Sequence, residues 1–248
     1  MNTDNISKFA EIVKNSRKIV FFGGAGVSTE SGLKDYRSKD GIYNTYSKYG
    51  ISPEEILSID FFNEDPKTFY RFYREFFLHN AKPNKAHLAL AQLEKSDKQF
   101  TVITQNVDNL HQLAGSKNVL ELHGTAEKYY CAKCGKNYSK NFIADTSKEV
   151  PICTECGGIV RPYVTLYGEM LNEFVTERAI RAIWEADVLI IGGTSLTVYP
   201  AAGFINYFNG THLVVINKEH TSSDSRADLV FHDNIGEVMD ALVKQLEI

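Results

Sequence analysis

The four cysteines of this 248-residue chain are the side chains whose spacing points most directly to chemistry. Cys131 and Cys134 form one Cys-x-x-Cys pair, and Cys153 and Cys156 form a second pair after eighteen intervening residues. Two such pairs can bring four thiolates to one tetrahedral ion, with the spacing typical of a zinc ribbon. Two disulfides are the alternative, which a reducing cytosol disfavours. Because four thiolates leave no open coordination position, we expect one structural Zn²⁺ ion and no thiol catalysis.

A glycine-rich turn at residues 23–32 directly follows the apolar run at residues 18–22. Glycines between a strand and a helix allow backbone N–H groups to approach a phosphate, which the N-terminus of the helix then favours. The match to the G-x-G-x-x-G dinucleotide-binding pattern is imperfect, because Thr29 occupies the position of the third glycine. The turn predicts phosphate binding, with a purely structural tight turn as the alternative.

Polar side chains follow several other short apolar runs, at residues 105–108, 123–124, 192–195 and 217. In a doubly wound sheet, ligands bind outside the carboxyl ends of the strands. These groups should therefore meet at the edge of the sheet where the glycine-rich turn also opens. A few convergent polar groups of this kind are typical of a small-molecule pocket.

Four of the histidines differ in what their positions predict. His123 ends an apolar run and precedes Gly124, so it can face the pocket as a base whose ordinary pKa lies near neutrality. His232 also follows an apolar run, but no polar cluster flanks it in the sequence. His87 and His111 fall in expected helices and are interpreted as packing or capping residues. His123 is the histidine that we predict to be catalytic.

Strands that alternate with helices must position these groups. Residues 173–186 and 236–246 repeat apolar side chains with a helical period, which predicts an α-helix in each. Short apolar runs rich in β-branched residues are typical of buried parallel strands. The pattern predicts an α/β fold with a doubly wound, Rossmann-like parallel sheet. The expected strands are residues 18–22, 100–104, 119–122, 188–191, 213–216 and 229–231.

Two stretches interrupt this alternation. Residues 35–84 are rich in aromatic residues, and Pro66 opens an expected helix that runs through Leu78. Aromatic side chains at helical spacing usually fill a core, so we interpret those of this helix as packing residues and not as a ligand site. Residues 125–160 are polar and loop-like and contain all four cysteines. Both stretches are predicted to be insertions that together form a smaller lobe.

The composition excludes some classes of protein. Hydrophobic residues make up 43% and charged residues 23% of the chain, and the formal net charge is −4, so no general affinity for nucleic acid or anionic membranes is expected. The longest apolar runs, at residues 19–22 and 188–191, are too short to span a bilayer. Residues 1–14 lack the apolar run of a signal peptide. We therefore expect a cytoplasmic protein.

Taken together and in order, these motifs resemble those of a sirtuin. The resemblance runs from about residue 16 to the C-terminus, and the size without long extensions is similar to that of a bacterial member. The segments that carry it are residues 24–32, 35–37, 104–108, 123–124, the four cysteines, 161–162, 167–169, 193–195 and 214–217.

The resemblance implies an NAD-dependent protein-lysine deacetylase or deacylase, which transfers the acyl group to ADP-ribose and releases nicotinamide. His123 would be the general base that activates a ribose hydroxyl. Asn106 would position the ribose and an ordered water, and Gln105 would also contact the ribose. Asp108 and the backbone of Val107 would hold the nicotinamide carboxamide.

The resemblance also implies the other contacts of NAD and of an acyl-lysine peptide. The peptide would pass between the lobes and add a strand to the adjoining loops. The remaining cofactor residues would be Gly24, Ala25, Gly26, Thr29, Asp35, Tyr36, Arg37, Gly193, Thr194, Ser195, Asn217 and Ile235, the last four of these on the adenosine side. The substrate-binding residues would be Val164, Leu166, Tyr167, Gly168 and Glu169.

With this resemblance, the two insertions divide the chain into domains. We also expect the protein to be a monomer. The NAD-binding domain would comprise residues 1–34, 85–124 and 161–248, with a helical insertion at 35–84 and the zinc ribbon at 125–160. Members that remove acidic acyl groups carry a Tyr-x-x-Arg pair in the helical insertion. Here the aligned pair is Tyr70 and Tyr73, which lacks the cation and favours acetyl or other neutral acyl groups. In a different register, Arg71 or Arg74 would supply the cation.

Three other functions remain open at the level of the sequence. An ADP-ribosyltransferase or NAD glycohydrolase would use the same scaffold and differ in what attacks the ribose. A non-catalytic NAD-sensing or zinc-ribbon module would only bind. An oxidoreductase is disfavoured, because dehydrogenases usually carry an acid after the second strand to hold the adenine ribose, and Asn217 is the better candidate for that contact here.

Overall fold

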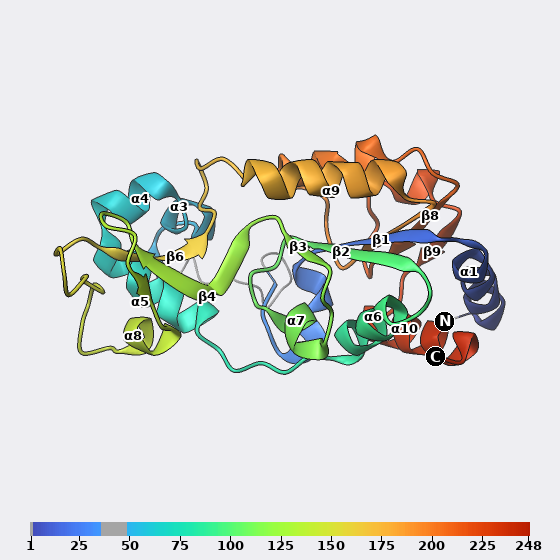
Figure 1. Cartoon of the computed structure of the whole chain (residues 1–248), viewed down its shortest axis with the longest axis horizontal. Helices are drawn as coiled ribbons and strands as arrows, with labels where there is room; N and C mark the ends of the chain where they lie inside the picture. The colour runs from blue at the N-terminus through green and yellow to red at the C-terminus, as the bar shows by residue number, and fades with distance from the viewer. Residues whose placement is uncertain (1, 36–48) are drawn as a thin grey trace.

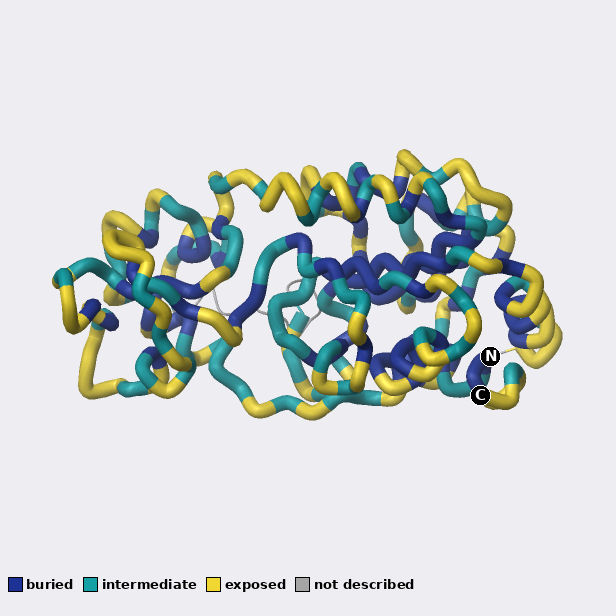
Figure 2. The backbone as a smooth tube through the Cα atoms, in the orientation of Figure 1, coloured by how far each residue is buried: buried dark blue, intermediate teal, exposed yellow. Residues whose placement is uncertain are grey.

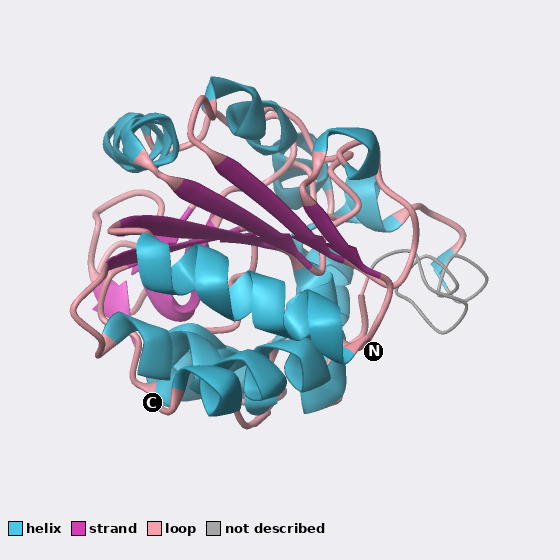
Figure 3. Ribbon diagram, turned by 90° about the vertical axis from the view of Figure 1, so that its right-hand side faces the viewer, coloured by secondary structure: helices cyan, strands magenta, loops and turns pink. Residues whose placement is uncertain are grey.

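The computed structural model describes residues 2–35 and 49–248 and contains a parallel sheet of six strands. The strand order is β3-β2-β1-β7-β8-β9, and helices cover both faces of the sheet, as Figure 3 shows. The predicted doubly wound α/β fold is confirmed. All of the expected strands form, as β1 (Lys18–Gly23), β2 (Gln99–Thr104), β3 (Val119–Glu121), β7 (Val188–Gly192), β8 (His212–Ile216) and β9 (Leu229–Phe231).

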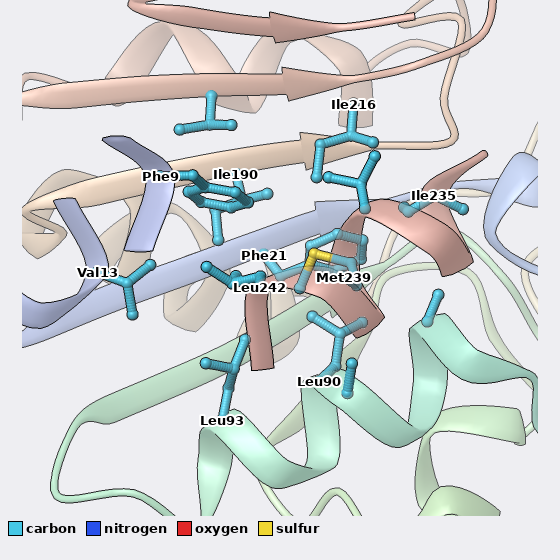
Figure 4. Close-up of a cluster of buried hydrophobic side chains, with 14 of the residues drawn as sticks. Phe9, Val13, Phe21, Leu90, Leu93, Ile190, Ile216, Ile235, Met239 and Leu242 are labelled. Carbon is cyan, nitrogen blue, oxygen red and sulfur yellow. The ribbon is translucent and has the colours of Figure 1, made fainter. Parts of the chain in front are cut away.

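The first face of this sheet carries the larger hydrophobic core. Phe21 and Ile190 of the strands meet Phe9, Leu90 and Met239, each of which comes from a different helix (Figure 4). Because alternate residues of a strand point to opposite faces, their neighbours in sequence face the other way. The three helices are α1 (Thr3–Asn15), α6 (Lys85–Glu94) and α10 (Ile235–Leu246).

The second face of the sheet is covered by α9 (Glu173–Glu185) and by the 3₁₀ helix η4 (Ala201–Tyr207). Val20 and Leu189 of the strands pack there against Ile183 of α9. The strands are thus buried from both sides, which Figure 2 shows as a dark blue band through the larger lobe. Burial on both faces explains why the sequence of each strand is a continuous apolar run.

The strand order reverses between β1 and β7. From β1 the chain continues through β2 to β3 at one edge, and from β7 it continues through β8 to β9 at the other edge. The loops after β1 and β7 therefore diverge from neighbouring strands, which creates a ligand-binding position outside their carboxyl ends. The glycine-rich turn after β1 and residues 193–195 after β7 lie at this point.

A smaller lobe, at the left of Figure 1, is built around an antiparallel sheet with the order β5-β4-β6. Its strands are β4 (Gly124–Cys131), β5 (Asn137–Tyr138) and β6 (Val160–Val164). The expectation that residues 125–160 are loop-like was therefore wrong for β4, which pairs with β5 and β6 and shifts register between Thr125 and Tyr129. The helices of the lobe are α3 (Pro53–Ile56), α4 (Ile59–Glu64), α5 (Pro66–Phe77) and α8 (Lys140–Ala144).

Aromatic side chains of α5 fill the core of this lobe, as predicted. Phe69, Tyr70 and Tyr73 are 0%, 0% and 1% exposed, and they pack with Tyr129 of β4. The hydroxyl group of Tyr70 donates a hydrogen bond to the carbonyl oxygen of Val160. One core thus joins the helical insertion to the cysteine-bearing insertion, which supports our proposal that they form one lobe.

The glycine-rich turn at residues 23–32 contains two short 3₁₀ helices, and no long helix begins between it and residue 35, where the first described range ends. The 3₁₀ helices are η1 (Ala25–Val27) and η2 (Thr29–Ser31). The helix N-terminus expected to face a phosphate is replaced here by two short turns. Among the described residues, no helix combines the length and the apolar character needed to cross a membrane.

Candidate active site

The turns after β1 and β7 lie in direct backbone contact. The N–H of Gly26 donates to the carbonyl oxygen of Gly193 over 2.8 Å, and a Cβ atom on Gly26 would lie 2.8 Å from the Gly193 Cα. Gly193 has a φ of +58°, and a Cβ atom there would lie 2.4 Å from the backbone nitrogen of Val27. Glycine is therefore required at both positions by the packing of the two turns, before any ligand is considered.

Residues 105–108 extend from the end of β2 toward these turns. The Nε2 of Gln105 donates to the Oγ1 of Thr194 over 3.1 Å. The Nδ2 of Asn106 lies 3.1 Å from the carbonyl oxygen of Gly24. These bonds tie the end of β2 to the turns after β1 and β7, so two of the predicted polar segments and the glycine-rich turn do converge.

Ser28 is a residue of this site that the sequence reasoning missed. It is 2% exposed, and its hydroxyl donates to the Oδ2 of Asp108 over 2.6 Å while accepting from the Nδ2 of Asn106 over 3.1 Å. The Oδ1 of Asp108 accepts from the N–H of Leu110, at the start of α7 (Leu110–Ala114). The position of Ser28 within the glycine-rich turn was the signal that could have found it, because a serine in such a turn can reach the end of the neighbouring strand.

His123 lies at the boundary between the two lobes. Its Nδ1 is 2.9 Å from the backbone carbonyl oxygen of Gln105. Because a carbonyl oxygen only accepts, the Nδ1 carries the hydrogen, and the Nε2 of the neutral ring is free to act as a base. Burial lowers the pKa of His123, with the bond to Gln105 opposing this effect, so the ring is neutral at pH 7.

The segment 164–169 begins directly beside His123. Gly124, which has a φ of +76°, pairs with Val164, and the N–H of Thr165 donates to the carbonyl oxygen of His123 over 2.9 Å. A Cβ atom on Gly124 would lie 2.0 Å from the carbonyl oxygen of Tyr163, so only glycine allows this approach. The two residues of the pair His123-Gly124 thus have different roles. The histidine can act as a base, and the glycine lets the predicted peptide-binding segment approach that histidine.

Glu169 holds the shape of this segment. Its carboxylate forms a bidentate ion pair with Arg161, with both N–O distances at 2.7 Å, and accepts from the N–H of Leu166 over 2.8 Å. Burial by itself would raise the pKa of Glu169, but the bonds to Arg161 and Leu166 lower it below its usual value. Its carboxylate is engaged within the protein, so its effect on a peptide would be indirect.

Backbone donors in the same segment are mostly engaged. The N–H of Tyr167 donates to Leu57, and the carbonyl oxygen of Tyr167 accepts from the N–H of Ile59. The N–H groups of Thr165, Leu166 and Glu169 are likewise bonded. Within residues 165–169, the N–H of Gly168 is the donor left for an added peptide strand.

The predicted adenosine-side residues are only partly brought together. Thr194 is 7% exposed and contacts Gln105, but Ser195 is exposed and pairs with Thr197. The side chain of Asn217, at the end of β8, donates to the carbonyl oxygen of Glu219. Ile235 is 5% exposed and packs in the core, so a ligand contact there would fall to its backbone.

The remaining predicted cofactor residues lie in or after the glycine-rich turn. Ala25 lies in η1, and the hydroxyl of Thr29 donates to the carbonyl oxygen of Gly26. Asp35 ends the first described range. Tyr36 and Arg37 lie outside the described residues, so their expected contacts are untested.

The four cysteines form a separate cluster in the small lobe. Their sulfur atoms all lie within 4.8 Å of one another, with Cys131 to Cys156 at 3.4 Å and Cys134 to Cys153 at 3.7 Å. A tetrahedral zinc site with Zn–S bonds of about 2.3 Å places its sulfurs roughly 3.8 Å apart. All four thiols are free of disulfides. The cluster therefore fits one ion whose four coordination positions are all filled by sulfur atoms.

Comparison with known proteins decides the family. The model of the Sir2 family matches residues 24–200. The NAD-dependent protein deacetylase of Clostridium perfringens is 54% identical over 242 residues, which is 97% of this chain and 99% of that protein. The chain belongs to the Sir2 family. The enzyme of the same name from Clostridium tetani is 50% identical, over 98% of this chain and 99% of that protein.

Solved Sir2 structures share the fold over nearly the whole chain. A Sir2 complex with p53 peptide and NAD⁺ has a TM-score of 0.86 and 37% identity, over 96% of this chain and 97% of that chain. A Sir2 variant with deacetylated p53 peptide and 3′-O-acetyl ADP-ribose has a TM-score of 0.91 and 38% identity, over 97% and 98%. The resemblance to sirtuins is confirmed.

Proposed function

We propose that this Sir2-family protein is an NAD-dependent protein-lysine deacylase that transfers an acyl group to ADP-ribose and releases nicotinamide. The observation that carries the proposal is the position of His123. Its free Nε2 belongs to a neutral ring that lies between the polar ends of β1, β2 and β7 and the segment 164–169. A base in this position can act on a hydroxyl group of a bound dinucleotide at the place where the dinucleotide contacts a bound peptide.

NAD would bind along the carboxyl ends of the strands. When bound, it supplies a glycosidic bond to nicotinamide whose cleavage lets the ribose accept the acyl oxygen. Asn106 and Asp108 are held by Ser28 and by the backbone of Gly24, so their side chains are ordered before the ligand arrives. Such ordering lowers the entropic cost of holding reacting groups in line.

His123 would remove a proton from a ribose hydroxyl through Nε2. The hydrogen bond from Nδ1 to the Gln105 carbonyl sets the tautomer and orientation of the ring. The same bond stabilises the ring once it is protonated, since the carbonyl oxygen faces the N–H that gains positive charge. Gln105 in turn contacts Thr194, which couples the orientation of the base to the turn after β7.

An acyl-lysine peptide would lie against the segment 164–169. Support comes from the free N–H of Gly168 and from the proximity of Val164 to His123 through Gly124. Glu169 would act by holding this segment through Arg161. Tyr70 and Tyr73 are buried in the core of the small lobe, and Arg74 is bonded to four backbone carbonyl oxygens. This arrangement supports a preference for neutral acyl groups.

The zinc, the domain division and the cellular setting complete the proposal. One Zn²⁺ ion bound by the four cysteines would hold β4 to the loop that carries Cys153 and Cys156. The NAD-binding domain would comprise residues 1–34, 85–124 and 161–248. The protein would act as a cytoplasmic monomer on acyl-lysine proteins, without nucleic acid or membrane as partner.

Mass spectrometry of an acetyl-lysine peptide incubated with NAD tests the proposal. The wild-type protein should remove the acetyl group and release nicotinamide and O-acetyl-ADP-ribose in equal amounts. His123→Ala should lower the rate of deacetylation by about 10²–10⁴-fold, which is the usual contribution of a general base. His212→Ala is the matched control, because His212 lies at the opposite end of β8 and is not a predicted site residue.

One result would contradict the deacylase proposal, and another would contradict the role of His123 as its base. Nicotinamide release with the acetyl group retained, also with longer neutral acyl chains, would mean that this site cleaves NAD for hydrolysis or ADP-ribosyl transfer. Full deacetylation by His123→Ala would mean that another group is the base. Circular dichroism and zinc content of the variant establish that it is folded in both cases.

A further inference from the structure

A second cluster of metal-binding side chains lies far from the cysteines in sequence, at the carboxyl ends of β8 and β9. It comprises His220, Asp224 and His232, whose nearest ligand atoms all lie within 4.8 Å of one another. The Oδ2 of Asp224 is 3.0 Å from the Nδ1 of His220 and 3.5 Å from the Nε2 of His232. The sequence alone does not indicate this cluster, because β9 separates His232 from His220 and Asp224 along the chain.

The distances suit a transition-metal ion. With Zn–N and Zn–O bonds of about 2.0–2.1 Å, tetrahedral ligand atoms lie roughly 3.3 Å apart. Both distances from the carboxylate fall close to that value, and the two imidazole rings have their centroids 4.3 Å apart. Only small side-chain rotations would therefore be needed to bring the three atoms around one ion.

Other bonds orient two of the three side chains. Thr221 holds the Oδ1 of Asp224 through its hydroxyl, over 2.7 Å, and through its N–H, over 3.2 Å, which leaves the Oδ2 for the histidines. The Nδ1 of His232 lies 3.0 Å from the carbonyl oxygen of Asn217. Metal-binding histidines usually donate their second ring N–H to a carbonyl or carboxylate in this way.

The bond to Asn217 also fixes which nitrogen of His232 is available. A carbonyl oxygen can only accept, so the Nδ1 carries the hydrogen, and the neutral ring directs the lone pair of Nε2 at the carboxylate oxygen of Asp224. A metal ion placed between these two atoms would accept both lone pairs.

We propose that His220, Asp224 and His232 form a binding site for a second divalent transition-metal ion, of the Zn²⁺ class. Two imidazoles and one carboxylate suit such an ion better than Mg²⁺, which prefers oxygen ligands. Three protein ligands leave at least one position for water, and His220 is exposed, so the ion would exchange with the solvent. The ion would link the loop 217–224 to the end of β9.

Titration of the zinc-loaded protein with Zn²⁺ tests the site without NAD or peptide. Isothermal titration calorimetry at pH 7.5 should show one further ion per chain beyond the ion of the cysteine cluster. His220→Ala and Asp224→Asn should each weaken its affinity at least about tenfold, since each removes a ligand. His220 is largely exposed, so its replacement leaves the fold intact.

His212→Ala is the matched control. His212 also lies near a carboxylate, with its Nδ1 3.7 Å from Asp228, but in the described part of the chain no third metal-binding side chain lies beside this pair. Zn²⁺ should bind this variant as it binds the wild type, and Mg²⁺ should bind neither at the site. The proposal is overturned if the wild type takes up no further Zn²⁺ at millimolar concentration, or if His220→Ala and His212→Ala bind it equally.

A thermal unfolding series gives an independent readout. An ion that binds only the folded protein raises the melting temperature as its concentration exceeds the dissociation constant. Wild type and His212→Ala should show this rise with Zn²⁺, and His220→Ala and Asp224→Asn should not. A rise of equal size in all four proteins would assign the effect to other groups and would also contradict the proposal.

Discussion

At the scale of single residues, the site depends on side chains that order other side chains. Ser28 bonds both Asn106 and Asp108, and the carbonyl group of Gln105 orients His123. Neither Ser28 nor the Gln105 carbonyl needs to touch a ligand to affect it. Groups held before the ligand arrives lose less entropy on binding, so the loss of such a positioning bond should weaken binding or catalysis more than stability.

Ser28→Ala is expected to lower kcat/KM about tenfold, equivalent to ~1.4 kcal/mol, because Asp108 and Asn106 lose a shared partner. The KM for NAD and kcat should be measured at pH 7.5, together with the midpoint of urea unfolding. A positioning role predicts that the kinetic loss exceeds the change in stability.

Ser31→Ala is the control for this variant. Ser31 lies in the next short turn, and its buried hydroxyl has no hydrogen-bond partner among the described residues. Its replacement should leave both kinetics and stability close to the wild type. If Ser28→Ala stays within twofold of the wild type in kcat/KM, the network is not needed to order the site.

At the scale of elements, the small lobe depends on a few short strands and a metal cluster. β5 has two residues, and Ile152 and Ile159 form one isolated bridge near the last two cysteines. Such short pairings are marginal without a further link. The four cysteines supply this link between the end of β4 and the loop before β6.

Removal of the zinc is therefore expected to unfold the cysteine-bearing part of the small lobe. Structural zinc sites contribute on the order of 10–16 kcal/mol of apparent binding free energy. The hydrophobic core of this small lobe is not expected to supply a comparable free energy of folding once the ion is lost. Metal analysis of freshly purified, reduced protein should find one tightly bound Zn²⁺ per chain. Chelation should then change the tyrosine signal in near-ultraviolet circular dichroism.

The lone tryptophan provides the internal control for that experiment. Trp184 lies on α9 in the larger lobe, where its fluorescence should change little as the small lobe unfolds. Reduced protein that contains no zinc yet keeps a folded small lobe would refute the structural role of the cluster.

At the scale of the whole molecule, a buried pair of histidines makes the stability of the fold depend on pH. His87 of α6 and His111 of α7 have ring centroids 4.8 Å apart and are 0% and 1% exposed. Burial lowers the pKa of His87 to about 4, and burial together with the nearby His87 lowers the pKa of His111 to about 3. Both rings are therefore neutral in the folded protein at pH 7.

Stability should fall as the pH decreases below about 6.5. The unfolded chain, with ordinary histidine pKa values near 6.5, binds protons that the folded protein excludes until about pH 4. The stabilisation is complete above pH 6.5 and is lost progressively toward pH 4, by on the order of 2 kcal/mol per ring at pH 5. Urea unfolding between pH 7.5 and 5 measures this loss.

His111→Leu separates this pair from other titrating groups. The variant should lose less stability than the wild type between pH 7.5 and 5, whatever its stability at pH 7.5, because one buried ring no longer gains a proton on unfolding. His212→Ala should keep the slope of the wild type. Equal slopes for wild type and His111→Leu would mean that the buried pair does not control acid sensitivity.

The sequence by itself determined the α/β class, the positions of the six parallel strands, the cysteine cluster and the polar strand ends. Each of these follows from local rules: a strand buried on both faces must be apolar throughout, and a Cys-x-x-Cys pair acts within one turn. The packing role of Phe69, Tyr70 and Tyr73 followed in the same way from helical spacing.

Only the tertiary structure decided the features that depend on contacts between distant segments. The sequence indicated neither the strand β4 nor the bond from Ser28 to Asp108, because each depends on partners far along the chain. The cluster of His220 with His232 is of the same kind, since β9 brings it together. Local patterns specify which elements form, whereas the strand order and the packing of the lobes specify which side chains meet.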